Sequence, residues 1–255
     1  MRIALGVEYN GSNFNGWQSQ PDGRTVQDHI QQALSRIACE PVSIIAAGRT
    51  DTGVHALEQV IHFDTTTERP LSAWVRGVNA LLPPSIVILW AHPVPEDFHA
   101  RFSAQARSYQ YVLINRPVRS AVHNGKVGWF HAQLDIKAMR DAAQHLLGKH
   151  DFSAFRAAEC QAKSPVKTLA QLDIQQNGDT FIFDFKAEAF LHHMVRNIVG
   201  CLIYVGKGKY PPHWMKQVVD SRQRSLAAPT FSPDGLYLRH ISYDAKWGLP
   251  QLYFE

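Results

Sequence analysis

The sequence predicts an α+β fold built from two similar halves, each with a largely antiparallel β-sheet flanked by helices. Two observations predict it. Each half follows roughly the order strand, helix, strand, strand, helix, which favours helices layered on an antiparallel sheet. The 255 residues are 45% hydrophobic, enough for one large domain or two packed halves. We place the halves at residues 1–104 and 105–255, with the seam inside residues 98–106.

The first half begins with an apolar run over residues 2–9, which predicts a strand. Thr25 and Asp28 are spaced as a helix cap. The residues that follow them, Val26, Ile30, Leu34 and Ile37, recur at helical spacing. The remaining expected elements are strands at residues 42–47, 60–63 and 86–90 and a helix near 70–80, with a polar loop over residues 48–55.

The second half shows the same order of elements. Asn177-Gly178 joins two alternating runs, which predicts a hairpin, and three phenylalanines of its second run share one face. Asp135 is expected to cap a helix that ends near Gly148. The other expected elements are a strand at residues 109–115 and a helix at about 190–205. The apolar stretch 247–254 either covers the core or closes an interface.

The overall composition sets only broad limits on function. The formal charge of +4 and the pI of about 9.0 permit a nucleic-acid partner without requiring one. Three cysteines without CxxC spacing argue against a disulfide framework or a zinc finger. Glu8 interrupts the N-terminal apolar run too early for a signal peptide, and no run approaches the roughly 18 apolar residues of a membrane span. We therefore expect a cytoplasmic protein that does not enter membranes.

The densest group of reactive side chains is the segment Gly48–Ala56, GRTDTGVHA. Arg49, Asp51 and His55 lie on a loop between two expected strands, where catalytic groups often sit. The same residues also suit an ordinary surface turn. The tripeptide Asp51-Thr52-Gly53 matches the signature of aspartic proteases, but those need two such carboxylates, and Arg49 would oppose the sharing of one proton.

Several other segments do not match the known catalytic or ligand-binding motifs that they partly resemble. Residues 206–209, GKGK, lack the glycine spacing and the hydroxyl residue of a phosphate-binding loop. No GxSxG is present, and the residues after His55 do not form a zinc-deaminase motif. His192 and His193, placed on a helix, would point about 100° apart and would not easily share a metal. We therefore expect no metal site.

The expected helix near residues 190–205 has one apolar face. Its opposite face collects His192, His193, Arg196, Asn197 and Gly200, which supply donors and no carboxylate. That face is either solvated, or Arg196 meets an anion, a phosphate or a carboxylate from another segment.

A third segment, residues 99–111, alternates cations with aromatic side chains. Arg101 and Arg107 flank its centre, and Tyr109 and Tyr111 would share one face of a strand. This mixture suits a nucleic-acid backbone and a stacked base, although both tyrosines could simply be half-buried strand residues.

Together these segments resemble the tRNA pseudouridine synthase A (TruA) family. The resemblance runs over almost the whole chain and rests on motifs that occur in the same order. They are Gly16-Trp17-Gln18, Gly48–Ala56, Gly77-Val78-Asn79, Phe98–Ala104, Phe155-Arg156-Ala157 and Phe190–Asn197. The resemblance implies the pseudouridine synthase fold and an isomerase, tRNA pseudouridine(38–40) synthase, which acts on the anticodon stem-loop.

The resemblance also implies roles for individual residues. Asp51 would be the catalytic nucleophile, buried and deprotonated, and Arg196 would pair with it. Tyr109 would lie against the flipped uracil, and Arg49 would enter the RNA and hold the target base out of the stack. We further expect phosphate contacts from four basic residues, Arg101, Arg107, Arg156 and Lys163.

The same resemblance implies partners and cofactors. We expect tRNA as the substrate, a homodimer, and no cofactor, since the reaction moves no electrons and loses no group. A related pseudouridine synthase with another RNA target, and an RNA-binding protein without chemistry, stay as alternatives. The latter would have no need of a carboxylate beside a phosphate-rich ligand.

Overall fold

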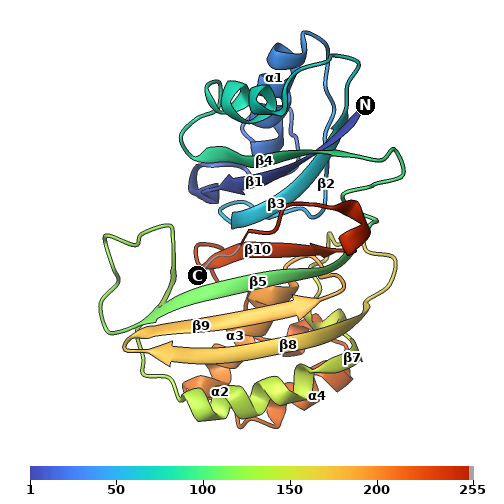
Figure 1. Cartoon of the computed structure of the whole chain (residues 1–255). Helices are drawn as coiled ribbons and strands as arrows, with labels where there is room; N and C mark the ends of the chain where they lie inside the picture. The colour runs from blue at the N-terminus through green and yellow to red at the C-terminus, as the bar shows by residue number, and fades with distance from the viewer. Residues whose placement is uncertain (253–255) are drawn as a thin grey trace. The chain divides into compact units, whose positions relative to one another are not determined.

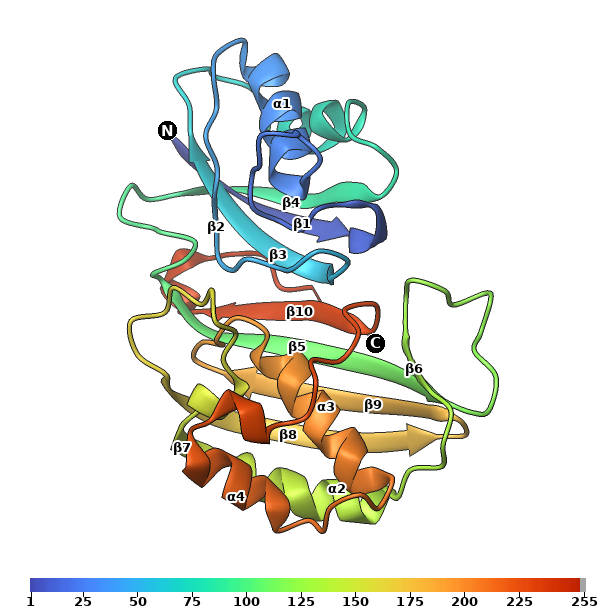
Figure 2. The same cartoon turned by 180° about the vertical axis from the view of Figure 1, so that it is seen from behind.

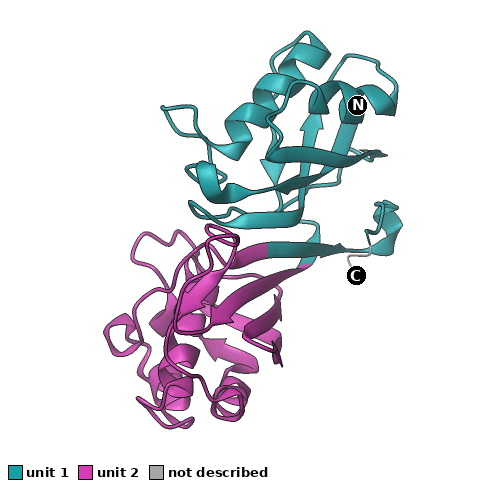
Figure 3. Ribbon diagram, turned by 90° about the vertical axis from the view of Figure 1, so that its left-hand side faces the viewer, with its two compact units in different colours: residues 1–105, 238–255 teal, residues 106–237 magenta. Residues whose placement is uncertain are grey.

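The computed structural model describes residues 1–252 and has the expected α+β architecture with largely antiparallel strand pairing. The chain divides into two compact units (Figure 3). Unit 1 comprises Met1–Gln105 and Leu238–Glu255, and unit 2 comprises Ala106–Tyr237. The division expected from sequence, after residue 104, did not include this return of the C-terminal segment to the first unit.

Unit 1 is built on β1 (Arg2–Tyr9), which pairs antiparallel with β3 (His55–Asp64) and β4 (Ile86–Val94) (Figure 1). β1 is buried on both faces, since only Glu8 of its residues is exposed. The short β2 (Ile45–Ala46) pairs with β3, and β10 (Leu236–Tyr243) follows β3 in the strand order. The strand expected at residues 42–47 is therefore reduced to two residues.

The helix α1 (Val26–Ala38) forms where the capping pattern predicts it. Thr25 caps its first turn by accepting a hydrogen bond from the backbone N–H of Asp28, and Val26, Ile30 and Leu34 are buried. The helical segment near residues 70–80 contains a π-helical stretch, Ala73–Gly77, with Trp74 buried.

Unit 2 has the strand order β5 (Ala104–Asn115), β9 (Thr180–Ala187), β8 (Val166–Asn177) and β7 (Gly148–Asp151). These neighbours pair antiparallel, and only β6 (Gly128–Phe130) pairs parallel, with β5. β8 and β9 form the hairpin predicted at Asn177-Gly178, with Asn177 opposite Thr180.

One face of the unit 2 sheet is covered by α2 (Ile136–Ala143), α3 (Met194–Gly206) and α4 (Trp214–Ser221) (Figure 2). Asp135 caps α2 as predicted, accepting from the N–H of Ala138. The alternating phenylalanines of β9 form the centre of this core, each 1% exposed or less: Phe181, Phe183 and Phe185. The burial of each side chain stabilises the folded state by about 2 kcal/mol, because its apolar surface is removed from water.

The C-terminal segment contributes to the core of unit 1. Trp247 is 9% exposed, and its ring lies 5.2 Å from that of Phe98. Trp247, the first residue of the apolar stretch 247–254, therefore covers the core. Phe254, near the end of that stretch, lies outside the described residues. Among residues 1–252, no helix is long and apolar enough to cross a bilayer.

Candidate active site

The loop that carries Asp51 is held in place on both sides. Before it, Thr50 is buried, and its hydroxyl lies 2.7 Å from the hydroxyl of Tyr9. The carbonyl of Thr50 also accepts a 3.0 Å bond from the N–H of Trp17. Because both the side chain and the backbone of Thr50 are bonded, the residue next to Asp51 has little freedom to move.

Gly16 makes the close approach between this loop and the Trp17 turn possible. Its φ is +81°, a conformation that L residues rarely adopt. A Cβ at this position would lie 2.9 Å from the carbonyl oxygen of Thr50 and 3.1 Å from the carbonyl carbon of Asp51. The Gly16-Trp17 motif therefore packs directly against the candidate catalytic loop.

Two further side chains fix the ends of the loop. The side chain of Gln59 on β3 accepts from the N–H of Gly48 at 3.3 Å and donates to its carbonyl at 2.6 Å. At the other end, Nδ1 of His55 accepts a bond from the N–H of Gly11 at 3.1 Å. His55 is 2% exposed, so this bond gives it a structural role in the loop. Gln59 is not among the residues predicted from sequence, and the signal for it is a polar residue inside an apolar strand.

Asp51 is partly exposed on this anchored loop, and Arg49 is exposed. The family resemblance implies a buried carboxylate at position 51, and the observed burial of Asp51 is lower than that. The loop gives a fixed backbone from which a carboxylate can reach a substrate, as a nucleophile or a general base requires.

In unit 2, Tyr109 and Tyr111 lie in β5 with the predicted two-residue spacing, opposite Phe185 and Phe183. Tyr111 is fully buried and donates its hydroxyl to the carbonyl of Ser232 at 2.9 Å. Burial raises its pKa well above the ordinary value. Tyr109 is only partly buried, with its ring 5.0 Å from that of Phe190. Of the two tyrosines, Tyr109 is thus the one with accessible surface.

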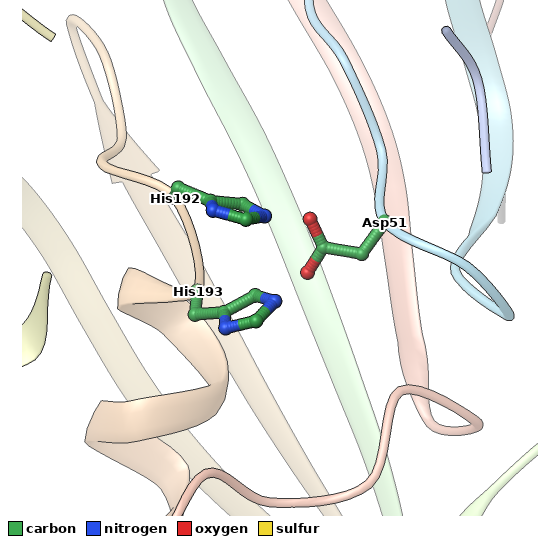
Figure 4. A group of neighbouring side chains, drawn as sticks. All are labelled: Asp51, His192 and His193. Carbon is green, nitrogen blue, oxygen red and sulfur yellow. The ribbon is translucent and has the colours of Figure 1, made fainter. Parts of the chain in front are cut away.

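The segment before α3 differs from the sequence-based expectation. His192 and His193 are not on the helix, since α3 begins at Met194 and His193 is its N-terminal cap with a φ of 61°. Their ring centroids lie 4.0 Å apart, and Figure 4 shows both rings projecting to the same side of the chain. The prediction that they point about 100° apart was wrong, because it assumed helical geometry.

Arg196, in the first turn of α3, is partly buried. Its Nε donates to the carbonyl of Phe231 at 2.9 Å, and its own carbonyl accepts from the Phe231 N–H at 3.3 Å. The ring of Phe231 lies 5.8 Å from that of Tyr111. Unit 2 therefore links Arg196 to Tyr111 of β5 through Phe231.

The remainder of that helix face is not solvated, contrary to one alternative from sequence. Asn197 is fully buried, donates to the carbonyl of Phe155 at 2.8 Å and accepts from Arg224 at 3.0 Å and Thr230 at 2.7 Å. A Cβ on Gly200 would lie 2.4 Å from the carbonyl oxygen of Pro229. The segment 224–231 thus covers α3, and no local sequence pattern marks Arg224 and Thr230 as partners of Asn197.

The four expected phosphate contacts differ in their surroundings. Arg101 and Lys163 are exposed, and Arg107 donates to the carbonyl of Glu188 at 2.7 Å. Arg156 donates from Nη2 to the carbonyls of Cys160 at 2.6 Å and Ala162 at 3.0 Å. These bonds give Arg156 a structural role, because they hold the backbone at Cys160 and Ala162. Its contact with phosphate stays a prediction.

Comparison with known proteins assigns the chain to a family. A family model described as tRNA pseudouridine synthase matches residues 6–103 and 142–244. The chain is 58% identical to a protein named tRNA pseudouridine synthase A from Dechloromonas aromatica (strain RCB), over 98% of this chain and 95% of that protein. It is 60% identical to the protein of the same name from Methylobacillus flagellatus, over 98% of this chain and 96% of that protein. The protein of the same name from Janthinobacterium sp. (strain Marseille) is 59% identical over 98% and 95%.

Proposed function

The chain belongs to the tRNA pseudouridine synthase family, and we propose that it isomerises uridine to pseudouridine in the anticodon stem-loop of tRNA, with Asp51 as nucleophile. The observation that carries the proposal is the anchored loop around Asp51. Bonds to Tyr9, Trp17 and Gln59 hold its backbone while Asp51 itself stays accessible. Such a fixed carboxylate suits chemistry on a nucleotide that is turned out of the RNA stack.

The reaction breaks the bond between N1 of uracil and C1′ of the ribose and forms a bond between C5 and C1′. The proton on C5 leaves, and N1 ends protonated, so atoms and electrons balance without an oxidant or a leaving group. A carboxylate serves as the nucleophile at C1′ or C6, or as the base that removes a sugar proton. Each route requires Asp51 in its ionised form.

Arg196 would keep Asp51 ionised and oriented. A guanidinium offsets the desolvation that a carboxylate suffers when a base covers it, and its planar fork fits both oxygens. The bond from Nε of Arg196 to Phe231 supports this role because it fixes the plane of the guanidinium. Tyr109 would stack against the uracil, in keeping with its partly buried ring.

Arg49 would take the place of the extruded base. Removing a base from the stack costs a few kcal/mol, and a side chain inserted in the gap recovers part of that cost. The exposure of Arg49 at the loop surface supports this role. We further propose that the protein works as a cytoplasmic homodimer on tRNA, and that Arg101, Arg107, Arg156 and Lys163 contact phosphates.

Nucleotide-resolution mapping of pseudouridine tests this function. Unmodified tRNA is incubated with the purified protein, and the expected result is pseudouridine at positions 38–40 in the absence of any added cofactor. Modification only outside the anticodon stem-loop would favour a related synthase with another target. Tight tRNA binding without any modification would favour a protein that only binds RNA, and cleavage of casein would favour the aspartic-protease alternative.

A further inference from the structure

The C-terminal end of α3 carries a group of lysine and aromatic side chains that the catalytic roles do not use. We define this lysine–aromatic patch as Tyr204, Lys207, Lys209, Tyr210 and Trp214. Both lysines are exposed, and the three aromatic residues are partly exposed. All five residues belong to unit 2.

The lysines of the patch are positioned by the aromatic rings beneath them. The ammonium nitrogens of Lys207 and Lys209 each lie 4.3 Å from the ring centroid of Tyr204. Lys209 is also 5.3 Å from the ring of Tyr210, which stacks on Trp214 at 4.2 Å. These cation–π contacts limit the rotamer freedom of the two side chains.

Backbone hydrogen bonds also hold the two lysine residues of the patch in place. The N–H groups of Lys207 and Lys209 donate to the carbonyls of Ile203 and Tyr204, both at 3.0 Å, and so close the end of α3. Lysines at this end of a helix also interact favourably with its dipole, which is the ordinary structural explanation for them. That explanation accounts for the positive charge but gives no role to the partly exposed aromatic rings.

The charge of the patch is not neutralised by ion pairs. Within residues 1–252 neither lysine has a carboxylate at ion-pair distance, whereas the nearby Lys137 and Lys216 pair with Asp141 and Asp220. Asp135 lies next to the end of α3, since its backbone N–H donates to the carbonyl of Gly206. Its carboxylate accepts a hydrogen bond from the N–H of Ala138. Two ordered, unpaired ammonium groups above aromatic rings fit an anionic polymer better than an apolar protein surface.

We propose that the lysine–aromatic patch binds phosphates of tRNA outside the target loop. The proposal rests on the tRNA-directed function given above. Lys207, the C-cap residue of α3, lies eleven residues after Arg196, which is about 16 Å at ~1.5 Å per residue. That length spans about five base pairs of a duplex. With a nucleotide at Arg196, RNA about five base pairs away would be at the right distance to reach the patch.

The test compares the Lys207→Gln, Lys209→Gln double variant with the wild-type chain and with Lys149→Gln, Lys186→Gln, which removes two exposed lysines elsewhere in unit 2. Affinity for unmodified tRNA is measured over a series of salt concentrations. We expect the patch variant to bind about tenfold more weakly, with a salt slope lower by about two, one for each ammonium group that no longer meets a phosphate. The control variant is expected to keep the wild-type slope, and Lys207→Arg, Lys209→Arg to retain both affinity and slope.

The salt slope of tRNA binding decides between the two roles. If the patch were purely structural, its loss would lower the melting temperature and leave the salt slope unchanged. A patch variant with the same slope as wild type overturns the proposal, whatever its melting temperature. A changed oligomeric state by light scattering with an unchanged slope overturns it too, and assigns the patch to a second protein copy. Wild-type protein that forms no pseudouridine would contradict the proposed function instead, so the two failures are distinguishable.

Discussion

The hydroxyl groups of Tyr9 and Thr50 lie 2.7 Å apart and form a buried hydrogen bond one residue before Asp51. This bond links β1 to the candidate catalytic loop. We expect Tyr9→Phe to lower the turnover number about tenfold while it lowers the free energy of unfolding by only about 1 kcal/mol, the usual worth of one hydrogen bond. Steady-state kinetics on tRNA and urea denaturation check this.

The matched control is Tyr243→Phe, which also removes a tyrosine hydroxyl bond in unit 1, the 2.6 Å bond to the carbonyl of Ala100. We expect it to change stability by a similar amount with little effect on turnover. Equal losses of turnover in the two variants would show that the bond to Thr50 has no special effect on the loop.

Asn197 is the buried polar centre that joins α3 to Phe155 and to the segment 224–231. Asn197→Ala would remove three hydrogen bonds, so the buried carbonyl of Phe155 loses this donor and Arg224 and Thr230 lose this acceptor, and we expect a loss of about 3 kcal/mol in the free energy of unfolding. Urea denaturation measures this loss. The exposed Asn124→Ala serves as control and is expected to change stability by less than about 0.5 kcal/mol. A loss below about 1 kcal/mol for Asn197→Ala would contradict this role.

His62 gives the fold a dependence on pH. Burial, with smaller contributions from Arg2 and His99, lowers its pKa to about 4, and its Nδ1 accepts from the N–H of Ala100. The unfolded chain therefore binds a proton that the folded chain does not, and stability should fall as the pH drops from about 6.5 to about 4. The loss from this one group is at most about 3 kcal/mol.

The variant His62→Asn tests that dependence, because asparagine can still accept the Ala100 bond and cannot be protonated in this range. We expect its melting temperature to fall less steeply between pH 6.5 and 4 than that of the wild-type protein. Parallel pH profiles for the two proteins would assign the acid sensitivity to other groups.

Arg196→Lys should harm catalysis more than folding, because lysine keeps the charge and loses the planar two-pronged donor. Arg140→Lys is a matched control, since the Nε of Arg140 also donates to a backbone carbonyl, that of Ile174 at 2.8 Å. We expect both variants to melt within a few degrees of wild type and only Arg196→Lys to slow single-turnover modification, about 100-fold or more. A large drop in melting temperature with an unchanged rate would contradict the catalytic role.

Local patterns predicted the secondary structure well where neighbouring residues determine it. The cap formed by Thr25 and Asp28 and the hairpin at Asn177-Gly178 are set within a few residues, and both were confirmed. The alternating phenylalanines of β9 were placed on one face because side chains on a strand alternate.

Expectations that depended on distant segments were less successful. Asn197 and Gly200 could not be recognised as buried because the segment that covers them lies about thirty residues later. The close approach of the His192 and His193 rings depends on the left-handed backbone of His193, which is rare outside glycine. The return of Leu238–Glu255 to unit 1 likewise has no local pattern.

Single-turnover modification of tRNA by Asp51→Asn is the most direct test of the nucleophile. Asparagine has nearly the same shape and removes only the charge, and Asp97→Asn, an exposed substitution in the same unit, is the control. We predict that Asp51→Asn binds tRNA within a few-fold of wild type and forms no detectable pseudouridine. Formation of pseudouridine at a rate near that of wild type would contradict the role of Asp51.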